Sequence, residues 1–394
     1  MSIKNRNIYS VEDPYVYLTN DLPIECFVEY LPNELVDDNV YFCDQKEKGI
    51  RCLIKVAYEP FQTFAQSSAT KIAKVFGDIN NNFLQNHSVL RHKTKEETST
   101  SFKTQYSELC YFDKNSFPEI ANTLLLNTTA DRTYLPYANL IYCFTDDRAD
   151  ISTFQIYVNK YANESLKSWI NVFDETKHIV DATSEEQRTQ MKEEVLLSFL
   201  FRNLFTDFDF TTKNLGVIYK KDGTVMLAPN FDYGEFFNPV RKRRYQTLPK
   251  IDFDLIPPEM RQFVQIANQN MLESAKKETP EGLAHNPYSD SYNKENIKFI
   301  CKHYPHLAYQ FLNLIRELQK PENVEKINNI IDSYGEKGAS IITQDQCDFV
   351  KEFIKQRYIY YSAILKDKLK DYVERGYIQS ENAYICDGSA YQPN

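Results

Sequence analysis

The chain of 394 residues contains eight cysteines, and no two of them form a CxxC pair. Zinc sites and small disulfide scaffolds are built from closely spaced cysteines, so this pattern argues against both classes. We expect reduced thiols that are mostly buried. No repeat of fixed period is present either.

The sequence also lacks an apolar run of roughly 18 residues, the length that indicates a membrane-spanning helix. Its first ten residues, MSIKNRNIYS, lack the apolar core of a signal peptide. We therefore predict a cytoplasmic protein without a membrane partner. Secretion into another cell as an effector would leave no such signal, and it stays open.

Positive charge is in deficit, since 46 Lys and Arg stand against 55 Asp and Glu and give a net charge of −9. Nucleic-acid backbones bind clustered cations, so direct nucleic-acid binding is not expected. One dense basic run, residues 241–244 (Arg-Lys-Arg-Arg), has two interpretations. It is either a solvated loop or a site for an anion, a phosphorylated side chain or an acidic substrate.

The composition that is present belongs to a folded protein, with 42% hydrophobic and 14% aromatic residues. A disordered chain would contain fewer aromatic residues. Single hydrophobic cores stop growing at about 250–300 residues, so a chain of this length has room for two lobes and a cleft between them.

Short apolar runs punctuated by Pro, Asp and Asn predict strands between residues 15 and 56, including a hairpin formed by 40–43 and 52–56. Helical spacing starts at residue 64 and is predicted to end at Gly77, because glycine often follows a helix. The polar stretch 80–116 is predicted to be a long loop or a mobile insertion. Further strands are predicted at 139–144 and 153–158, and helices at 165–172, 185–205, 258–276, 293–319, 321–334 and 344–375.

A group of polar residues follows the predicted helix 185–205. Asp209 and Asn214 precede an apolar run, 217–219, which a Lys-Lys-Asp-Gly turn joins to a second run that leads to Asp232. A hairpin of this kind brings the loop before it and the loop after it to the same end. The three side chains are therefore predicted to converge.

Phosphoryl transfer requires a carboxylate that accepts the proton of the attacking hydroxyl, and oxygen ligands that hold Mg²⁺ against nucleotide phosphates. We assign the first role to Asp209 and metal binding to Asn214 and Asp232. Lys213 is assigned to neutralise charge on the transferring group. The alternative is that Asp209 and Asn214 only cap turns, and Asp207 is interpreted as a structural carboxylate.

These residues resemble the pattern of the HipA-like serine/threonine kinases. In that family a catalytic Asp lies five residues before a metal-binding Asn, and an apolar hairpin leads to a Pro-containing strand end whose last Asp binds the metal. Asp209, Asn214 and Asp232 match the pattern in type and spacing, and the phrase 227–232 (Leu-Ala-Pro-Asn-Phe-Asp) is similar as well. The resemblance spans about residues 35–375, and the chain looks like the compact, short-toxin-like or translocated-kinase-like members.

The resemblance also implies a nucleotide site. Lys55 resembles the strand lysine that contacts the α- and β-phosphates in kinases, and the alternative is an exposed lysine on an edge strand. The hinge that frames adenine would fall near residues 158–161. Contacts to ATP are accordingly predicted for Lys55, Asn159, Lys160, Tyr161, Thr211, Lys213, Asn214, Phe231 and Asp232.

The chain departs from the family pattern at three places. Thr211 stands where many members have His, and Gln66 stands where a helix Glu usually pairs with the strand lysine. Lys55 is therefore expected to find another acidic partner. No Gly-rich loop precedes Lys55, since Gly49 alone is present there.

The sequence thus predicts an α+β, two-lobed protein-kinase-like fold, with a small β-rich N-lobe over residues 1–158 and a mostly helical C-lobe over 159–394. The predicted activity is Mg²⁺-dependent transfer from ATP to Ser or Thr of a protein. Autophosphorylation, on the N-lobe or near Thr247, stays open, as does an antitoxin or other regulatory partner. A pseudokinase that senses nucleotide or binds a partner is the alternative, and a kinase of lipid head groups or small molecules is less favoured.

Overall fold

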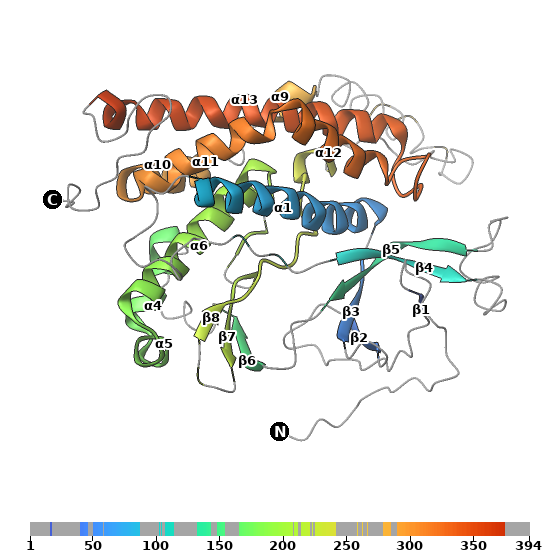
Figure 1. Ribbon diagram of the computed structural model, residues 1–394. Helices are drawn as coiled ribbons and strands as arrows, with labels where there is room; N and C mark the ends of the chain where they lie inside the picture. Colours follow the sequence, from blue (N-terminus) through green and yellow to red (C-terminus); the bar gives the residue numbers. More distant parts are fainter. Residues whose placement is uncertain are drawn as a thin grey trace.

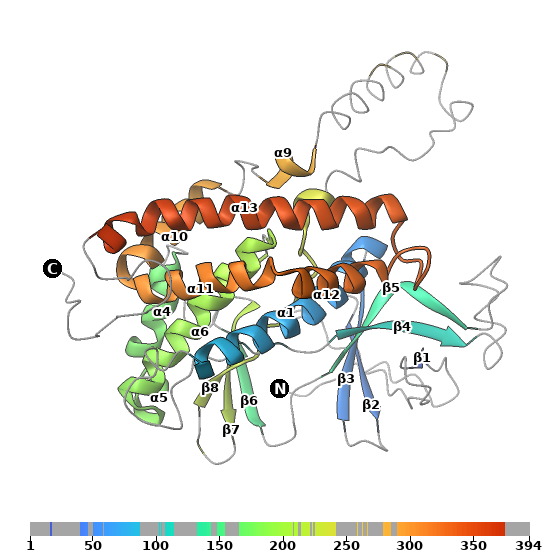
Figure 2. The same ribbon diagram turned by 45° about the horizontal axis from the view of Figure 1, so that its top comes forward.

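The computed structural model forms a mostly helical core with two small sheets, and both views place the sheets on the same side of the long helices (Figures 1 and 2). No helix in the described part of the chain is both long and apolar enough to cross a membrane. The described residues are 16–17, 40–45, 50–57, 59–86, 102, 104, 107–113, 132–142, 148–153, 165–207, 209–211, 214–220, 223, 225–241, 258, 262, 266, 279–284 and 290–374.

The larger sheet has five antiparallel strands in the order β1-β4-β5-β3-β2. Its predicted hairpin is confirmed, because β2 and β3 pair with Val40 opposite Lys55. On its other side β3 pairs with β5, so Lys55 lies on a central strand and not on an edge. The bounds are β1 Val16–Tyr17, β2 Val40–Gln45, β3 Ile50–Val56, β4 Ser107–Asp113 and β5 Arg132–Tyr142.

The smaller sheet contains the second predicted hairpin, β7 Gly216–Lys220 with β8 Val225–Leu227, and β6 Arg148–Thr153 pairs with the outer side of β7. Gly223 in the turn has φ of 87°, a backbone conformation that glycine adopts without steric cost. The strand predicted at 153–158 is found earlier in the chain, as β6. Residues 154–164 lie outside the described residues, and the lobe boundary at 158 stays a prediction.

Helix α1, Pro60–Asn86, overturns the prediction that Gly77 ends a helix. A Cβ atom at Gly77 would lie 3.2 Å from the carbonyl oxygen of Phe102, so glycine serves here for close packing and not as a stop. The predicted loop 80–116 is likewise wrong at both ends, where α1 and β4 lie. Pattern alone could not separate these uses of glycine, because the neighbour at Phe102 is distant in sequence.

Helices α10 to α13 form a layer above the sheets in Figure 1, and α4 and α5 lie beside the smaller sheet. The predicted segment 293–319 is two helices, because Pro305 begins a new one after Tyr304. The segment predicted at 258–276 falls almost wholly outside the described residues. The bounds are α4 Leu166–Glu175, α5 Lys177–Ala182, α6 Glu185–Leu204, α9 Pro280–Ala284, α10 Asp290–His303, α11 Pro305–Leu318, α12 Pro321–Asp332 and α13 Gln344–Glu374.

Helix α6 forms the centre of the core. It begins with a capping box in which Ser184 and Gln187 bond each other's backbone, and every residue from Val195 to Leu204 is buried. The Phe201 ring packs against Phe76 of α1 at 5.0 Å and against Phe236 at 5.8 Å between ring centroids. Each buried phenylalanine contributes about 1.5–3 kcal/mol, so these contacts hold α1, α6 and the chain around residue 236 together.

Arg357 of α13 fixes the end of α6. Its buried guanidinium donates to the carbonyl oxygens of Asn203 and Leu204 at 2.8 and 2.9 Å, and to that of Ala284 at 2.6 Å. A cation is favourable at a helix C-terminus, where the last carbonyl groups lack helical partners. The loop that follows α6 therefore starts from a rigid position.

Candidate active site

The loop between α6 and β7 carries the first part of the site. Thr206 takes a left-handed conformation, with φ of 56°, directly after α6 ends. The amides of Thr206 and Asp207 donate back to the carbonyls of Asn203 and Arg202. The chain is thereby turned back from the helix axis, and it reaches Asp209 two residues later.

Asp209 and Asn214 meet across this loop, as their spacing predicted. The Asn214 amide nitrogen donates to the backbone carbonyl of Asp209 at 2.6 Å and to its carboxylate at 3.1 Å. Asn214 is buried and Asp209 is exposed. Loss of water around the carboxylate and the neighbouring charge of Asp232 raise the pKa of Asp209, and the bond from Asn214 opposes the rise.

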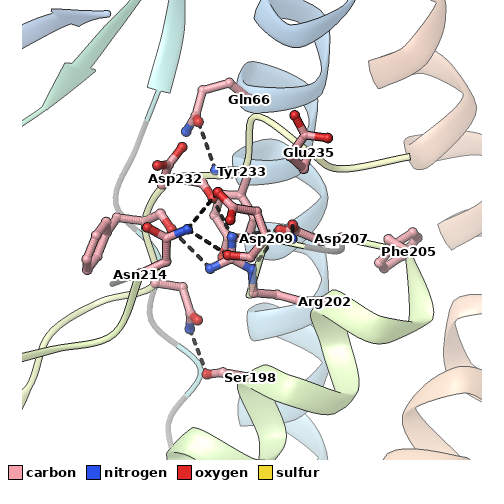
Figure 3. Close-up of polar contacts among 12 residues, drawn as sticks. Gln66, Ser198, Arg202, Phe205, Asp207, Asp209, Asn214, Asp232, Tyr233 and Glu235 are labelled. Atoms are coloured by element: carbon pink, nitrogen blue, oxygen red, sulfur yellow. Dashed lines mark hydrogen bonds and ion pairs between the residues drawn. The ribbon is translucent and has the colours of Figure 1, made fainter. Parts of the chain in front are cut away.

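The loop after β8 brings Asp232 to the same place (Figure 3). Asp232 has φ of 59°, and its carboxylate pairs with Lys55 of β3, the ammonium nitrogen lying 2.5 Å from Oδ1. Burial on its own raises the pKa of Asp232, but the charge and hydrogen bond of Lys55 outweigh it and the pKa falls below its ordinary value. Asp232 is thus the acidic partner that Lys55 was expected to find.

Gln66 has a different partner from the one that its position suggests. It lies buried on α1, and its side-chain oxygen accepts a hydrogen bond from the backbone nitrogen of Tyr233 at 2.8 Å (Figure 3). A neutral amide therefore ties α1 to the residue after Asp232. The Gln66 side chain does not bond the carboxylate of Asp232, which pairs with Lys55.

Arg241, the first residue of the basic run, bonds acidic side chains of the chain itself. Its guanidinium contacts Glu59, just before α1, at 2.5 Å, and it also contacts Glu235. Glu235 in turn accepts a hydrogen bond from Asn238. This group fastens the chain after Asp232 to the start of α1, while residues 242–244 lie outside the described residues.

Sequence reasoning missed Arg202 of α6. Its side chain is fully buried, pairs with Asp207 at 2.7 Å and also donates to the carbonyls of Phe231 and Asp232. Burial raises the pKa of Asp207 to about 6, against the opposing charge of Arg202. The available signal was an arginine within the apolar stripe of a helix, five residues before an aspartate.

The other predicted nucleotide contacts divide into two groups. Thr211 and Phe231 lie beside the central residues, and the Thr211 hydroxyl is buried without a hydrogen-bond partner among the described residues. The remaining predicted contacts, Asn159, Lys160, Tyr161 and Lys213, fall outside the described residues and stay predictions.

The donors at this site fit magnesium. Asp209, Asn214 and Asp232 offer hard oxygen atoms, and the Asn214 bonds to Asp209 use only its amide nitrogen. In the described ranges, no three His, Cys, Asp or Glu side chains form a metal cage by themselves. Magnesium is commonly held by one or two carboxylates together with substrate phosphates, so this smaller donor set is sufficient.

No family model and no curated protein sequence matches the chain. Its structure is similar to the crystal structure of a proinflammatory kinase of Helicobacter pylori, CtkA, with a TM-score of 0.50 and 13% sequence identity. The match covers 88% of this chain and 97% of that one. The fold is kinase-like. At this identity the likeness concerns the fold alone.

Proposed function

We propose that the chain is a HipA-like serine/threonine protein kinase that transfers the γ-phosphate of ATP in the presence of Mg²⁺. The proposal rests on one observation: within a kinase-like fold, Asp209, Asn214 and Asp232 come together from two loops while Lys55 reaches them from the larger sheet. This set combines a proton acceptor, oxygen donors for a divalent cation and a cation for phosphate.

Each residue has a defined part in this proposal. Asp209 accepts the proton of the substrate hydroxyl as its oxygen attacks the γ-phosphorus, and the bond to the β-phosphate oxygen breaks to release ADP. Lys55 exchanges the Asp232 carboxylate for nucleotide phosphate oxygens. Asn214 and Asp232 would hold Mg²⁺, which offsets phosphate charge when bound.

The proposed substrate class is supported by the charge of the chain. A net charge of −9 disfavours nucleic acid, so we propose a protein substrate, with a regulatory partner such as an antitoxin as a further part of the proposal. The resemblance of residues 205–235 to the HipA-like pattern supports Ser or Thr as acceptor.

The decisive experiment follows labelled γ-phosphate from ATP onto protein with and without Mg²⁺. Asp209→Asn should keep ATP binding, measured by calorimetry, and lower transfer by about 10²- to 10⁴-fold, the usual contribution of a positioned base. Asp181→Asn is the matched control, since Asp181 is an exposed aspartate on α5. Transfer by Asp209→Asn at the wild-type rate would remove Asp209 from the mechanism.

A nucleotide-binding pseudokinase is the second candidate. It is favoured by the departure from the family pattern, in which a helix Glu pairs with the strand lysine. Here Lys55 bonds Asp232, and Gln66, which stands in place of that Glu, bonds the Tyr233 backbone. The same experiment separates the two candidates. A pseudokinase would bind ATP and give no labelled protein in the wild-type chain.

A further inference from the structure

Arg202 and Asp207 form a buried ion pair between the two loops of the candidate active site. Neither side chain has exposed area, and the Arg202 guanidinium contacts the Asp207 carboxylate at 2.7 Å (Figure 3). Burying two charges is costly unless their remaining donors and acceptors are satisfied. The partners of this pair are therefore informative.

The hydrogen-bond partners of the pair are backbone groups of both loops, the one between α6 and β7 and the one after β8. On one side, Asp207 accepts a hydrogen bond from the backbone nitrogen of Asp209 at 3.1 Å. On the other, Arg202 donates to the carbonyls of Phe231, at 3.1 Å, and Asp232. The pair thus holds the backbone at the proposed base and the backbone at the proposed metal ligand.

Aromatic contacts repeat this arrangement. The carbon at the centre of the guanidinium lies 4.8 Å from the centre of the Phe210 ring and 4.7 Å from that of the Tyr233 ring. These residues directly follow Asp209 and Asp232 in the sequence. A planar guanidinium can stack on rings and donate in several fixed directions at once, whereas a lysine ammonium is a compact point charge.

We propose that Arg202 and Asp207 are positioning residues that set the place of Asp209 relative to Asp232. This inference rests on the proposed function, but its physical content is the coupling of two loops. The hairpin β7–β8 joins the loops along the chain, and the buried pair joins them through space. Loss of the pair lets each loop move without the other.

The test compares Arg202→Lys and Asp207→Asn with the wild-type chain. Because a misplacement of about 1 Å can cost roughly 10²-fold, we expect Arg202→Lys to lower kcat about 10- to 100-fold while the KM for ATP changes less than about 3-fold. Asp207→Asn keeps the shape and the acceptor for the Asp209 amide, so its loss of kcat should be smaller.

Hydrogen exchange supplies a readout that needs no activity. Arg202→Lys should speed amide exchange in residues 205–215 and in residues 228–237 together, and leave α11 unchanged. The comparison variant is Arg357→Lys, which alters another buried arginine that bonds the end of α6 but bonds neither Asp207 nor the carbonyls of residues 231 and 232. It should therefore leave exchange in residues 228–237 unchanged. Thermal unfolding places the variants on one stability scale.

Two results would overturn the inference. One is faster exchange in a single loop, or in neither, in Arg202→Lys. The other is faster exchange in both loops in Arg357→Lys at an equal drop in Tm, which would indicate general destabilisation. If the wild-type chain transfers no phosphate, the proposed function fails by itself, and the exchange data still decide whether the pair couples the loops.

Discussion

Replacing Lys55 with methionine should make the nucleotide-free chain bind Mg²⁺ more tightly. In the structure Lys55 bonds the carboxylate that we assign to the metal, at 2.5 Å, so a cation that arrives without nucleotide must displace it. ATP would draw the lysine onto its phosphates and release Asp232. Nucleotide and Mg²⁺ are therefore expected to bind with positive coupling in the wild-type chain.

The magnitude follows from the contact. A hydrogen bond to a charged group contributes about 1.5–3 kcal/mol, and here the two side chains are 26% and 29% exposed, which favours the lower end through solvent screening. About 1.5 kcal/mol corresponds to roughly tenfold in an equilibrium constant. Lys55→Met should thus tighten Mg²⁺ binding about tenfold without nucleotide, and weaken ATP binding.

The assay is calorimetric titration of Mg²⁺ into the nucleotide-free chain at constant ionic strength, because salt screens charge effects. Lys74→Met is the control, since it removes the same charge from an exposed position on α1. Unchanged or weaker Mg²⁺ affinity in Lys55→Met, or an equal gain in Lys74→Met, would refute the reasoning.

Two further predictions concern pH and packing. Because the pKa of Asp209 is raised, its carboxylate protonates at a higher pH than an ordinary aspartate, and kcat/KM should fall on acidification with a midpoint above the pKa of an ordinary aspartate. A pH–rate profile whose acid limb lies at or below the ordinary aspartate pKa would contradict this. Gly77→Val should lower the free energy of unfolding by about 1–3 kcal/mol, because the valine side chain would meet the Phe102 carbonyl. Asp78→Val, on the exposed face of α1, should lower it less. Denaturant titration compares the two variants, and equal losses would contradict the role of Gly77 in close packing.

The partners of α1 suggest how the kinase-like fold holds its site together. Gln66 bonds the backbone after Asp232, and Glu59 reaches the same segment through Arg241. The first contact joins α1 to the backbone of Tyr233, and the second joins the residue just before α1 to Arg241, nine residues after Asp232. Neither contact uses the Asp232 carboxylate. That carboxylate is consequently available to Lys55 in the nucleotide-free chain.

The sequence by itself determined the local parts of the site. Asp209 and Asn214 are five residues apart, and the hairpin that follows them consists of two short apolar runs joined by a glycine-containing turn, so their contacts depend on short segments. Helix α6 was equally readable, because its apolar stripe repeats at helical spacing from Met191 to Leu204. Such features need no knowledge of the rest of the chain.

Tertiary structure alone decided which distant residues complete the site. The family resemblance assigned Lys55 and Asp232 to one nucleotide site, but the direct ion pair between these residues, which are 177 positions apart, was not predicted from the sequence. Arg202 was missed because its partners lie on two loops that only the fold brings around it. Gly77 was predicted to end a helix, and only the fold places the Phe102 carbonyl against it. The physical reason is the same in these cases. The partner of a buried charge, or the group that packs against a glycine, is set by contacts across the core, and the spacing of residues along the sequence does not reveal it.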